Sequence, residues 1–286
     1  MRMIPDPSKE VPVVDQVDVL VVGGGMTGVA AALSAARMGA KVLIVEQFNC
    51  LGGVATAGWH NHLSQYNAWD SDERVVGGIA HELGRRLVEG GWGTTDGSCI
   101  DFDVEGLKLL LDRMMAEAGV KVLYYTFFCD ALVEDGRIIG GVIQNKSGRQ
   151  AVLAHQVVDT TGDADVAARA GAPFKMGRER DGLCQPTTLM FTLEGVDWPR
   201  VAEWRTNYKM TEAWLQAQEA GIMEPFQNVI MGWWHTDVLP KQVGVNMTHM
   251  IRTDATDAGD LTQATIEGRR QAHHLTEVFR KVVAGM

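Results

Sequence analysis

The chain has 286 residues, of which 46% are hydrophobic and 22% charged, the composition of a globular rather than a disordered protein. Its net charge of -10 argues against a nucleic-acid partner or an anionic membrane, because long-range attraction to phosphates needs a positive surface. The first residues contain no apolar signal segment, and no apolar run approaches the roughly 18 residues of a membrane span. These features predict a soluble, cytoplasmic protein with two domains or one large one.

The first elements predicted along the chain form a βαβ unit. Residues 17–22 are a β-branched run typical of a buried parallel strand, and residues 41–46 form a second such strand. Between them, residues 26–38 are small and helix-forming, and Gly39 stands where a glycine commonly ends a helix. Strand, helix and strand fit within about 30 residues, as a βαβ unit requires.

The middle of the chain changes from helical to strand periodicity. Apolar residues at helical spacing predict helices over 79–89 and 104–118. Runs separated by turns then predict strands over 120–128, 130–134, 138–144 and 150–158. We therefore expect a β-meander whose last strand leads into Thr160-Thr161-Gly162-Asp163 and a short helix.

Beyond Pro173 the pattern is looser. The predicted elements are a strand over 187–193, a helix from Pro199 to Gly221, strands over 228–235 and 242–251, and a helix over 260–284. Asp260 and Gln263 have the spacing of a capping box at the start of this last helix. The segment before that helix is expected to be β-rich.

A glycine motif joins the first strand to the first helix. Residues 23–28, Gly-Gly-Gly-Met-Thr-Gly, satisfy G-x-G-x-x-G: Gly23 allows the tight turn, Gly25 lets a pyrophosphate approach the backbone, and Gly28 permits close helix packing. The phosphates then lie at a helix N-terminus, which favours negative charge. Glu46 ends the second strand about 20 residues further on, where a carboxylate accepts hydrogen bonds from a ribose and repels a 2′-phosphate. The sequence thus predicts a dinucleotide site that disfavours NADP.

The stretch from Asp18 to Gly58 resembles the FAD-dependent oxidoreductases that share a glutathione-reductase-like FAD domain, and the resemblance continues over 159–173 and 246–270. It implies FAD as cofactor. The residues it places around the ADP half are Gly23, Gly24, Gly25, Met26, Thr27, Gly28, Glu46 and Gln47. It also places Gly52, Gly53 and Thr56 against the pyrophosphate and ribityl chain, the Phe128 backbone at the adenine, and Thr161 and Gly162 beside the ADP. A turn that merely ends a strand explains Thr161 and Gly162 as well.

The candidate catalytic residues are His60 and His62. Flavin carries out redox chemistry at its own ring, and the protein supplies orientation and a proton donor or acceptor. Both histidines follow the Leu51–Gly58 segment, so they are suitably placed in sequence to approach that ring, and imidazole titrates near neutral pH. A loop or core histidine is the alternative reading for each. Weaker candidates for binding a substrate carboxylate are Arg178, Arg180, Asn246 and His249, and the cysteine spacing predicts no metal site.

The predicted fold is α/β, with a Rossmann-like FAD-binding domain of parallel sheet and β-meander over 1–172. A β-rich substrate region over 173–258 follows, and a C-terminal helix over 259–286 returns toward the FAD domain. The expected function is hydride transfer between a small organic substrate and flavin. The alternatives are an NAD-dependent dehydrogenase and an incomplete or non-catalytic flavin-binding fragment.

The resemblance also bears on partners and completeness. No second G-x-G-x-x-G motif follows a strand and no Cys-x4-Cys pair follows Glu46, so electrons are expected to enter by the substrate site or from a partner protein. An electron-transfer partner and a second copy of the chain both stay open. Members of the resembling family continue past the last helix with a segment that covers the flavin. A chain ending at Met286 is therefore expected to hold FAD weakly and to turn over poorly.

Overall fold

The computed structural model describes residues 10–68, 71–207, 210–224, 232–235 and 237–286. These residues form two compact units, each built from two separate segments of the chain. The first unit comprises Met1–Gly53 with Lys108–Phe174, and the second Val54–Leu107 with Lys175–Met286. The predicted regions 1–172, 173–258 and 259–286 divide the chain by function, and they stay a prediction.

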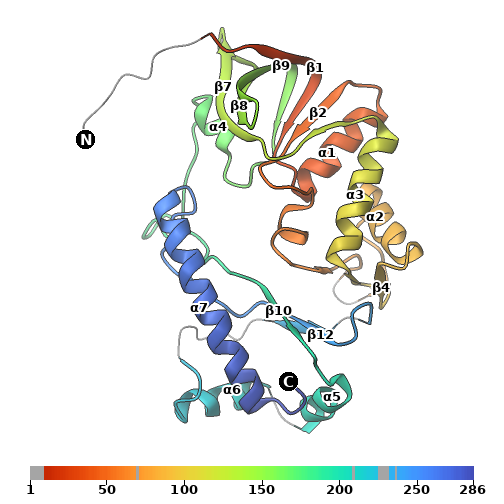
Figure 1. Ribbon diagram of the computed structural model, residues 1–286, viewed down its shortest axis with the longest axis vertical. Coiled ribbons are helices and arrows are strands. Elements are labelled where there is room, and N and C mark those ends of the chain that lie inside the picture. The colour runs from red at the N-terminus through yellow and green to blue at the C-terminus, as the bar shows by residue number, and fades with distance from the viewer. Residues whose placement is uncertain (1–9, 69–70, 208–209, 225–231, 236) are drawn as a thin grey trace. The chain divides into compact units, whose positions relative to one another are not determined.

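The first unit contains a six-stranded sheet in the order β6-β2-β1-β9-β8-β7 (Figure 1). Its strands are β1 (Val13–Val22), β2 (Val42–Val45), β6 (Lys121–Leu123), β7 (Phe127–Glu134), β8 (Arg137–Asn145) and β9 (Gly148–Asp159). Strands β6, β2, β1 and β9 pair in parallel, whereas β9, β8 and β7 pair antiparallel. The unit also contains the helices α1 (Met26–Arg37) and α4 (Asp165–Arg169) and the larger part of α3 (Val104–Ala118). The predicted α/β fold with a parallel sheet and a meander is confirmed.

Burial explains why these runs form the central strands. All four residues of β2 are buried, as are Leu20, Val21 and Val22 at the end of β1. Strands covered on both faces read as continuous apolar runs, which is the pattern seen in the sequence. The βαβ unit therefore places the carboxyl ends of β1 and β2 side by side, with the glycine motif following directly.

The predicted strand over 120–128 was wrong. It divides into β6 at one edge of the sheet and the start of β7 at the opposite edge. Tyr125 adopts a left-handed φ of 52°, and its N–H donates to the Phe48 carbonyl while that of Thr126 donates to the Glu46 carbonyl. These bonds hold the chain against the segment after β2 and redirect it, so the apolar run cannot continue as one strand.

The second unit contains two small antiparallel sheets. One is β10 (Phe191–Glu194), β12 (Gln242–Val245) and β11 (Trp233–His235), with β12 in the middle; the other is β3 (His62–Leu63), β5 (Ile100–Phe102) and β4 (Gly93–Thr95), with β5 in the middle. The helices of this unit are α2 (Gly78–Glu89), α5 (Trp198–Asn207), α6 (Met210–Glu219) and α7 (Ala258–Val282). Two further helices, α3 (Val104–Ala118) and the short 3-10 helix η1 (Gly53–Ala55), begin in one unit and end in the other.

An aromatic cluster forms the core of the second unit. Phe279 on α7 is fully buried, and its ring lies 5.1 Å from that of Trp214 on α6 and 5.6 Å from that of Trp233 on β11, both edge-on. Such edge-to-face pairs add to the burial of large apolar surfaces. The C-terminal helix is therefore anchored within the second unit, on the sheet of β10, β12 and β11.

Several predicted elements of this unit differ from those observed. The helix expected over 199–221 is two helices, α5 and α6, and residues 208–209 between them lie outside the described residues. The strand over 228–235 is described only at 232–235, where it forms β11, and that over 242–251 ends at Val245. Strands β3, β4 and β5 were not predicted, because two or three residues show no measurable alternation.

Helix α7 begins three residues earlier than the capping box suggests. Asp257 is its N-cap, and the side chain accepts a hydrogen bond of 2.9 Å from the Asp260 N–H. The prediction that Asp260 caps the helix with Gln263 was wrong, since Asp260 lies inside the first turn. Among the described helices, none has the length and apolar character needed to cross a bilayer.

The N-cap of α7 can be tested by substitution of Asp257. Replacing Asp257 by alanine leaves an N–H at the start of α7 without its acceptor, so we expect the free energy of unfolding to fall by about 1 kcal/mol. Gln263→Ala, which would matter if the predicted capping box formed, is expected to change it by less than about 0.5 kcal/mol. Urea unfolding measures both, and an equal loss in the two variants would contradict the observed cap.

Candidate functional site

Three glycines of the motif are required by contacts within the protein. A Cβ on Gly23, whose φ is +100°, would lie 2.4 Å from the Thr160 carbonyl oxygen. A Cβ on Gly28 would lie 2.0 Å from the Gly23 carbonyl oxygen. One on Gly24 would lie 2.5 Å from the side chain of Leu51. These positions hold glycine because backbone and side-chain atoms of the same unit fill the space of a side chain.

Gly25 is different, because a Cβ built there meets nothing within 4 Å. Its φ of -62° suits any residue, and it caps α1 without a side-chain hydrogen bond. The first N–H groups of a helix have no partner inside the helix, so the turn after Gly25 presents donors and a positive dipole end. Open space at the Cα and free donors at the helix start fit the pyrophosphate of a dinucleotide. Met26 and Thr27 open this turn.

Glu46 holds the glycine loop to the end of β2. It is 5% exposed, and its Oε2 accepts a hydrogen bond of 2.6 Å from the Gly24 N–H while its Oε1 accepts one of 2.8 Å from the Phe48 N–H. Each carboxylate oxygen has a second lone pair, so a ribose hydroxyl can still bind. The sequence predicted only the ribose contact, and the bond to Gly24 is new. Gln47, beside it, is exposed.

Gly52 and Gly53 lie directly on the glycine loop. The Gly52 N–H donates to the Gly24 carbonyl over 2.8 Å, and Gly25 and Gly52 form a parallel bridge. A Cβ on Gly53 would lie 3.0 Å from the Gly25 Cα, and both residues have positive φ. The two glycine motifs, predicted to meet one ligand, are thus in contact with each other. Thr56 belongs to the second unit, where it is fully buried.

Thr160 is a residue of this site that sequence reasoning missed. Its hydroxyl lies 2.9 Å from the Val22 carbonyl and 2.7 Å from the Gly23 carbonyl, and it donates to them. The predicted neighbour, Thr161, instead bonds to Asp159 over 2.7 Å. Thr160 and Thr161 both follow β9, which ends at Asp159, and no pattern in the sequence shows which of the two bonds to the loop after β1.

A pocket of about 400 Å³ lies beside the start of α1. The residues that line it are Thr27, Asp159, Thr160, Gly162, Ala164 and Ala167. Two residues predicted to contact FAD, Thr27 and Gly162, therefore share one pocket. Phe128 lies in the edge strand β7, and its ring packs on the core of the sheet against Gly141.

The contrast between Gly25 and Gly28 generates a second test, made without cofactor. Gly28→Ala forces a Cβ against the Gly23 carbonyl, so the free energy of unfolding is expected to fall by about 3 kcal/mol or more. Gly25→Val enters open space and is expected to change it by about 1 kcal/mol or less. Urea unfolding followed by circular dichroism measures both, and equal losses would contradict the open side of the loop.

His60 and His62 lie together in the second unit, as part of a polar and aromatic cluster. The Nδ1 of His62 is 2.6 Å from Oδ1 of Asp101, and the pairing of β3 with β5 sets these two residues opposite each other. Their side chains are 27% and 25% exposed, respectively. The pair is therefore sheltered and still open to a small ligand. Asp101 was not predicted, because nothing in its local sequence links it to His62.

Trp234 fixes the other side of this cluster. Its Nε1 donates a hydrogen bond of 2.8 Å to Oδ1 of Asn61, and its ring centroid lies 5.4 Å from that of His60 and 6.0 Å from that of His62. A Cβ on Gly244 would lie 2.5 Å from this indole, so only glycine leaves room for it. Burial lowers the pKa of His60, and the neighbouring His62 lowers it further.

The lowered pKa of His60 generates a third test. In the pH range between its native value and the ordinary value of about 6.5, the unfolded state binds more protons than the native state, so stability falls as the pH falls. We therefore expect the wild type to lose stability relative to His60→Gln when the pH is lowered from 7.5 to 5. Thermal unfolding across this range measures the difference. His155→Gln, at an exposed histidine, serves as control, and a parallel loss in all three proteins would contradict the effect.

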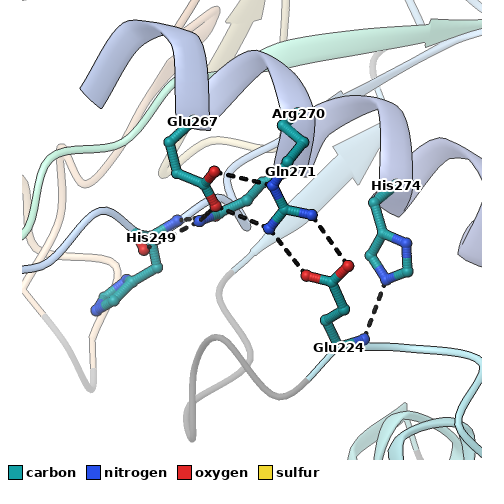
Figure 2. A network of polar contacts seen from close by, with 6 residues as sticks. All are labelled: Glu224, His249, Glu267, Arg270, Gln271 and His274. Carbon is teal, nitrogen blue, oxygen red and sulfur yellow. Dashed lines mark hydrogen bonds and ion pairs between the residues drawn. The ribbon is translucent and has the colours of Figure 1, made fainter. Parts of the chain in front are cut away.

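Of the weaker candidates, Arg178 and Arg180 are paired within the protein, whereas the buried Oδ1 of Asn246 has no hydrogen-bond partner among the described residues. Arg178 and Arg180 both bond to Asp181. Arg270 donates to both oxygens of Glu224 and both oxygens of Glu267, and it lowers the pKa of Glu267 to about 2 (Figure 2). The pair with Glu224 ties α7 to the segment after α6, and all three arginines already have carboxylate partners.

The remaining candidate, His249, bonds to Gln271 through its backbone. Its N–H donates to the Gln271 side chain over 2.7 Å, while Figure 2 shows its ring pointing away from the network. Within the described residues, no group of three or more histidine, cysteine or acidic side chains is arranged to hold a metal ion. His60, His62 and Asp101 form a separate group of titratable side chains in the second unit.

Parallel sheet, glycine loop and acidic strand end define a dinucleotide-binding protein of the Rossmann type. The family described as FAD dependent oxidoreductase matches residues 18–286. The chain belongs to this family, and FAD rather than NAD is its cofactor, as the sequence predicts. The finer assignment to a glutathione-reductase-like domain stays a prediction.

Individual relatives match over parts of their length. Thiamine thiazole synthase of Aeropyrum pernix is 33% identical over 164 residues, 53% of this chain and 57% of that protein. Digeranylgeranylglycerophospholipid reductase 2 of Methanothermobacter thermautotrophicus is 27% identical over 195 residues, 63% of this chain and 47% of that protein. The chain thus spans about half the length of the curated relatives it matches.

Solved structures share the fold. A geranylgeranyl bacteriochlorophyll reductase-like protein from Thermoplasma acidophilum superposes with a TM-score of 0.53 at 17% identity, covering 91% of this chain and 62% of that chain. A myxobacterial chondrochloren halogenase does so with a TM-score of 0.50 at 16% identity, covering 95% and 60%. At these identities the likeness concerns the fold alone.

Proposed function

We propose that this chain transfers a hydride between a small organic substrate and FAD bound at the glycine loop. The observation that carries the proposal is the open space at Gly25, framed by the start of α1 and by Gly52 and Gly53. No other glycine of the motif leaves such space, so a ligand rather than the protein is the reason for glycine at this position. FAD, when bound, supplies hydride transfer at its ring system.

The chain's own residues would hold the cofactor in a defined way. The first N–H groups of α1, at Met26, Thr27 and Gly28, are suited to bind the pyrophosphate. Glu46 is suited to accept a hydrogen bond from the adenosine ribose with the lone pairs that Gly24 and Phe48 leave free. The remaining proposed contacts are Gly52, Gly53, Thr56, the Phe128 backbone, Thr161 and Gly162.

The substrate class and the partner that supplies or accepts electrons are the next part of the proposal. The named relatives act on unlike molecules, so family membership supports a redox reaction without favouring one substrate. His60 and His62 are proposed to serve as proton donor or acceptor to a substrate that carries an O–H or N–H group. The electrons are proposed to leave or enter through a second small molecule, an electron-transfer protein or another copy of this chain.

One measurement distinguishes the proposed enzyme from a non-catalytic flavin-binding fragment. A non-catalytic flavin-binding fragment would bind FAD without being reduced by any substrate. We therefore expect the chain, after incubation with FAD and removal of unbound FAD by gel filtration, to keep the absorbance of bound oxidised flavin near about 450 nm. The band is expected to bleach without oxygen when small alcohols, hydroxy acids or amines are added. Absence of bound flavin contradicts the proposed function, and bound flavin that no substrate class reduces favours the fragment.

Variants of the loop provide the fourth test. Gly25→Val places a branched side chain where the pyrophosphate is proposed to lie, so flavin content is expected to fall to background while the fold persists. Glu46→Ala is expected to weaken the binding of FAD by about 1–3 kcal/mol, because a charged hydrogen-bond acceptor is lost. Glu46→Gln keeps one acceptor oxygen and should lose less. Titration of flavin fluorescence gives the dissociation constants, and full flavin content in a folded Gly25→Val protein contradicts the site.

A further inference from the structure

The strongest unassigned feature is the contact between His62 and Asp101, two residues separated by 39 positions in the chain. Strand pairing sets them opposite each other on β3 and β5, and the Phe102 N–H donates to the Asn61 carbonyl beside them. The contact therefore follows from the backbone rather than from two flexible side chains meeting at the surface.

The pair determines which ring nitrogen carries the proton. An ionised carboxylate can only accept hydrogen bonds, so the Nδ1 of His62, 2.6 Å from Asp101, must be the donor. In the neutral ring the other nitrogen, Nε2, then carries a lone pair. A carboxylate placed in this way also stabilises the imidazolium that forms when Nε2 takes up a proton.

The surroundings of His62 fit a role toward a ligand. The titratable groups that the described contacts place around it are Asp101 on β5 and His60 in the preceding loop, and Trp234 on β11 supplies an aromatic wall. Since burial lowers the pKa of His60, that ring is neutral near pH 7 and does not compete as a cation. The 27% exposure of His62 leaves an approach for a small molecule.

We propose that Nε2 of His62 takes up a proton from the substrate and that Asp101 is its positioning residue. In this step a substrate O–H or N–H bond breaks, an N–H bond forms at Nε2, and the electron pair stays on the substrate heteroatom. Asp101 then lies against the positive imidazolium. The inference rests on the proposed function and selects His62 over His60 as the proton acceptor.

The tautomer is tested first, without cofactor or substrate. In protein labelled with 15N-histidine, the ring nitrogen shifts of neutral His62 are expected to show Nδ1–H and an unprotonated Nε2. Asp101→Leu removes the acceptor and should shift the population toward Nε2–H, whereas Asp101→Asn retains an acceptor oxygen and should restore Nδ1–H. Asp18→Asn, opposite the exposed His155, is the control and should leave His62 unchanged. A wild type with Nε2–H would overturn the inference.

The proton transfer is tested with FAD-loaded protein and a substrate that bleaches the flavin. His62→Gln is expected to slow bleaching by about 100-fold or more, the scale of general acid–base catalysis, and His60→Gln by less than about tenfold. Asp101→Leu should lower the rate and alter its pH profile while FAD affinity stays that of the wild type. A full rate in His62→Gln with FAD bound overturns this inference alone, while a wild type that binds no FAD overturns the proposed function.

Discussion

The hydrogen bond from the Gly24 N–H to the buried carboxylate of Glu46 is the constraint on which the candidate cofactor site depends. It joins the loop after β1 to the end of β2. The Gly52 N–H then bonds to the Gly24 carbonyl, so three backbone segments meet at one residue. With both polar groups of Gly24 bound inside the protein, the neighbouring Gly25 is left facing open space.

The same hydrogen bonds explain how the buried carboxylate of Glu46 is tolerated. A carboxylate removed from water is costly unless hydrogen bonds replace its hydration. Glu46 receives two from backbone N–H groups, of Gly24 and Phe48, and it lies close to the positive end of α1. The acid that sequence reasoning assigns to ribose recognition is therefore also part of the architecture, and its substitution acts on the loop and on the ligand together.

Sequence reasoning succeeded where a contact is local or repeats along the chain. The βαβ unit, helix α3 and the meander follow from periodicity, and the glycine motif identifies its own turn. It failed where a contact joins distant segments with no regular pattern. The bonds of Thr160 to the end of β1 have no local signal, and the pairing of Asp101 with His62 depends on β3 and β5, each too short to be recognised. The break between β6 and β7 depends on bonds to the segment after β2, which no window around Tyr125 contains.

The two candidate sites differ in how much sequence change they tolerate. At Gly23 and Gly28 a single added carbon would lie within 2.4 Å of a backbone oxygen, so the cofactor loop cannot vary without a shift of the main chain. His62 and Asp101 meet through partly exposed side chains, and their strands pair through the backbone whatever those side chains are. Substitution of either side chain leaves the backbone pairing of the small sheet in place. The backbone of the first unit thus constrains its glycine loop more tightly than the backbone of the second unit constrains the side chains of His62 and Asp101.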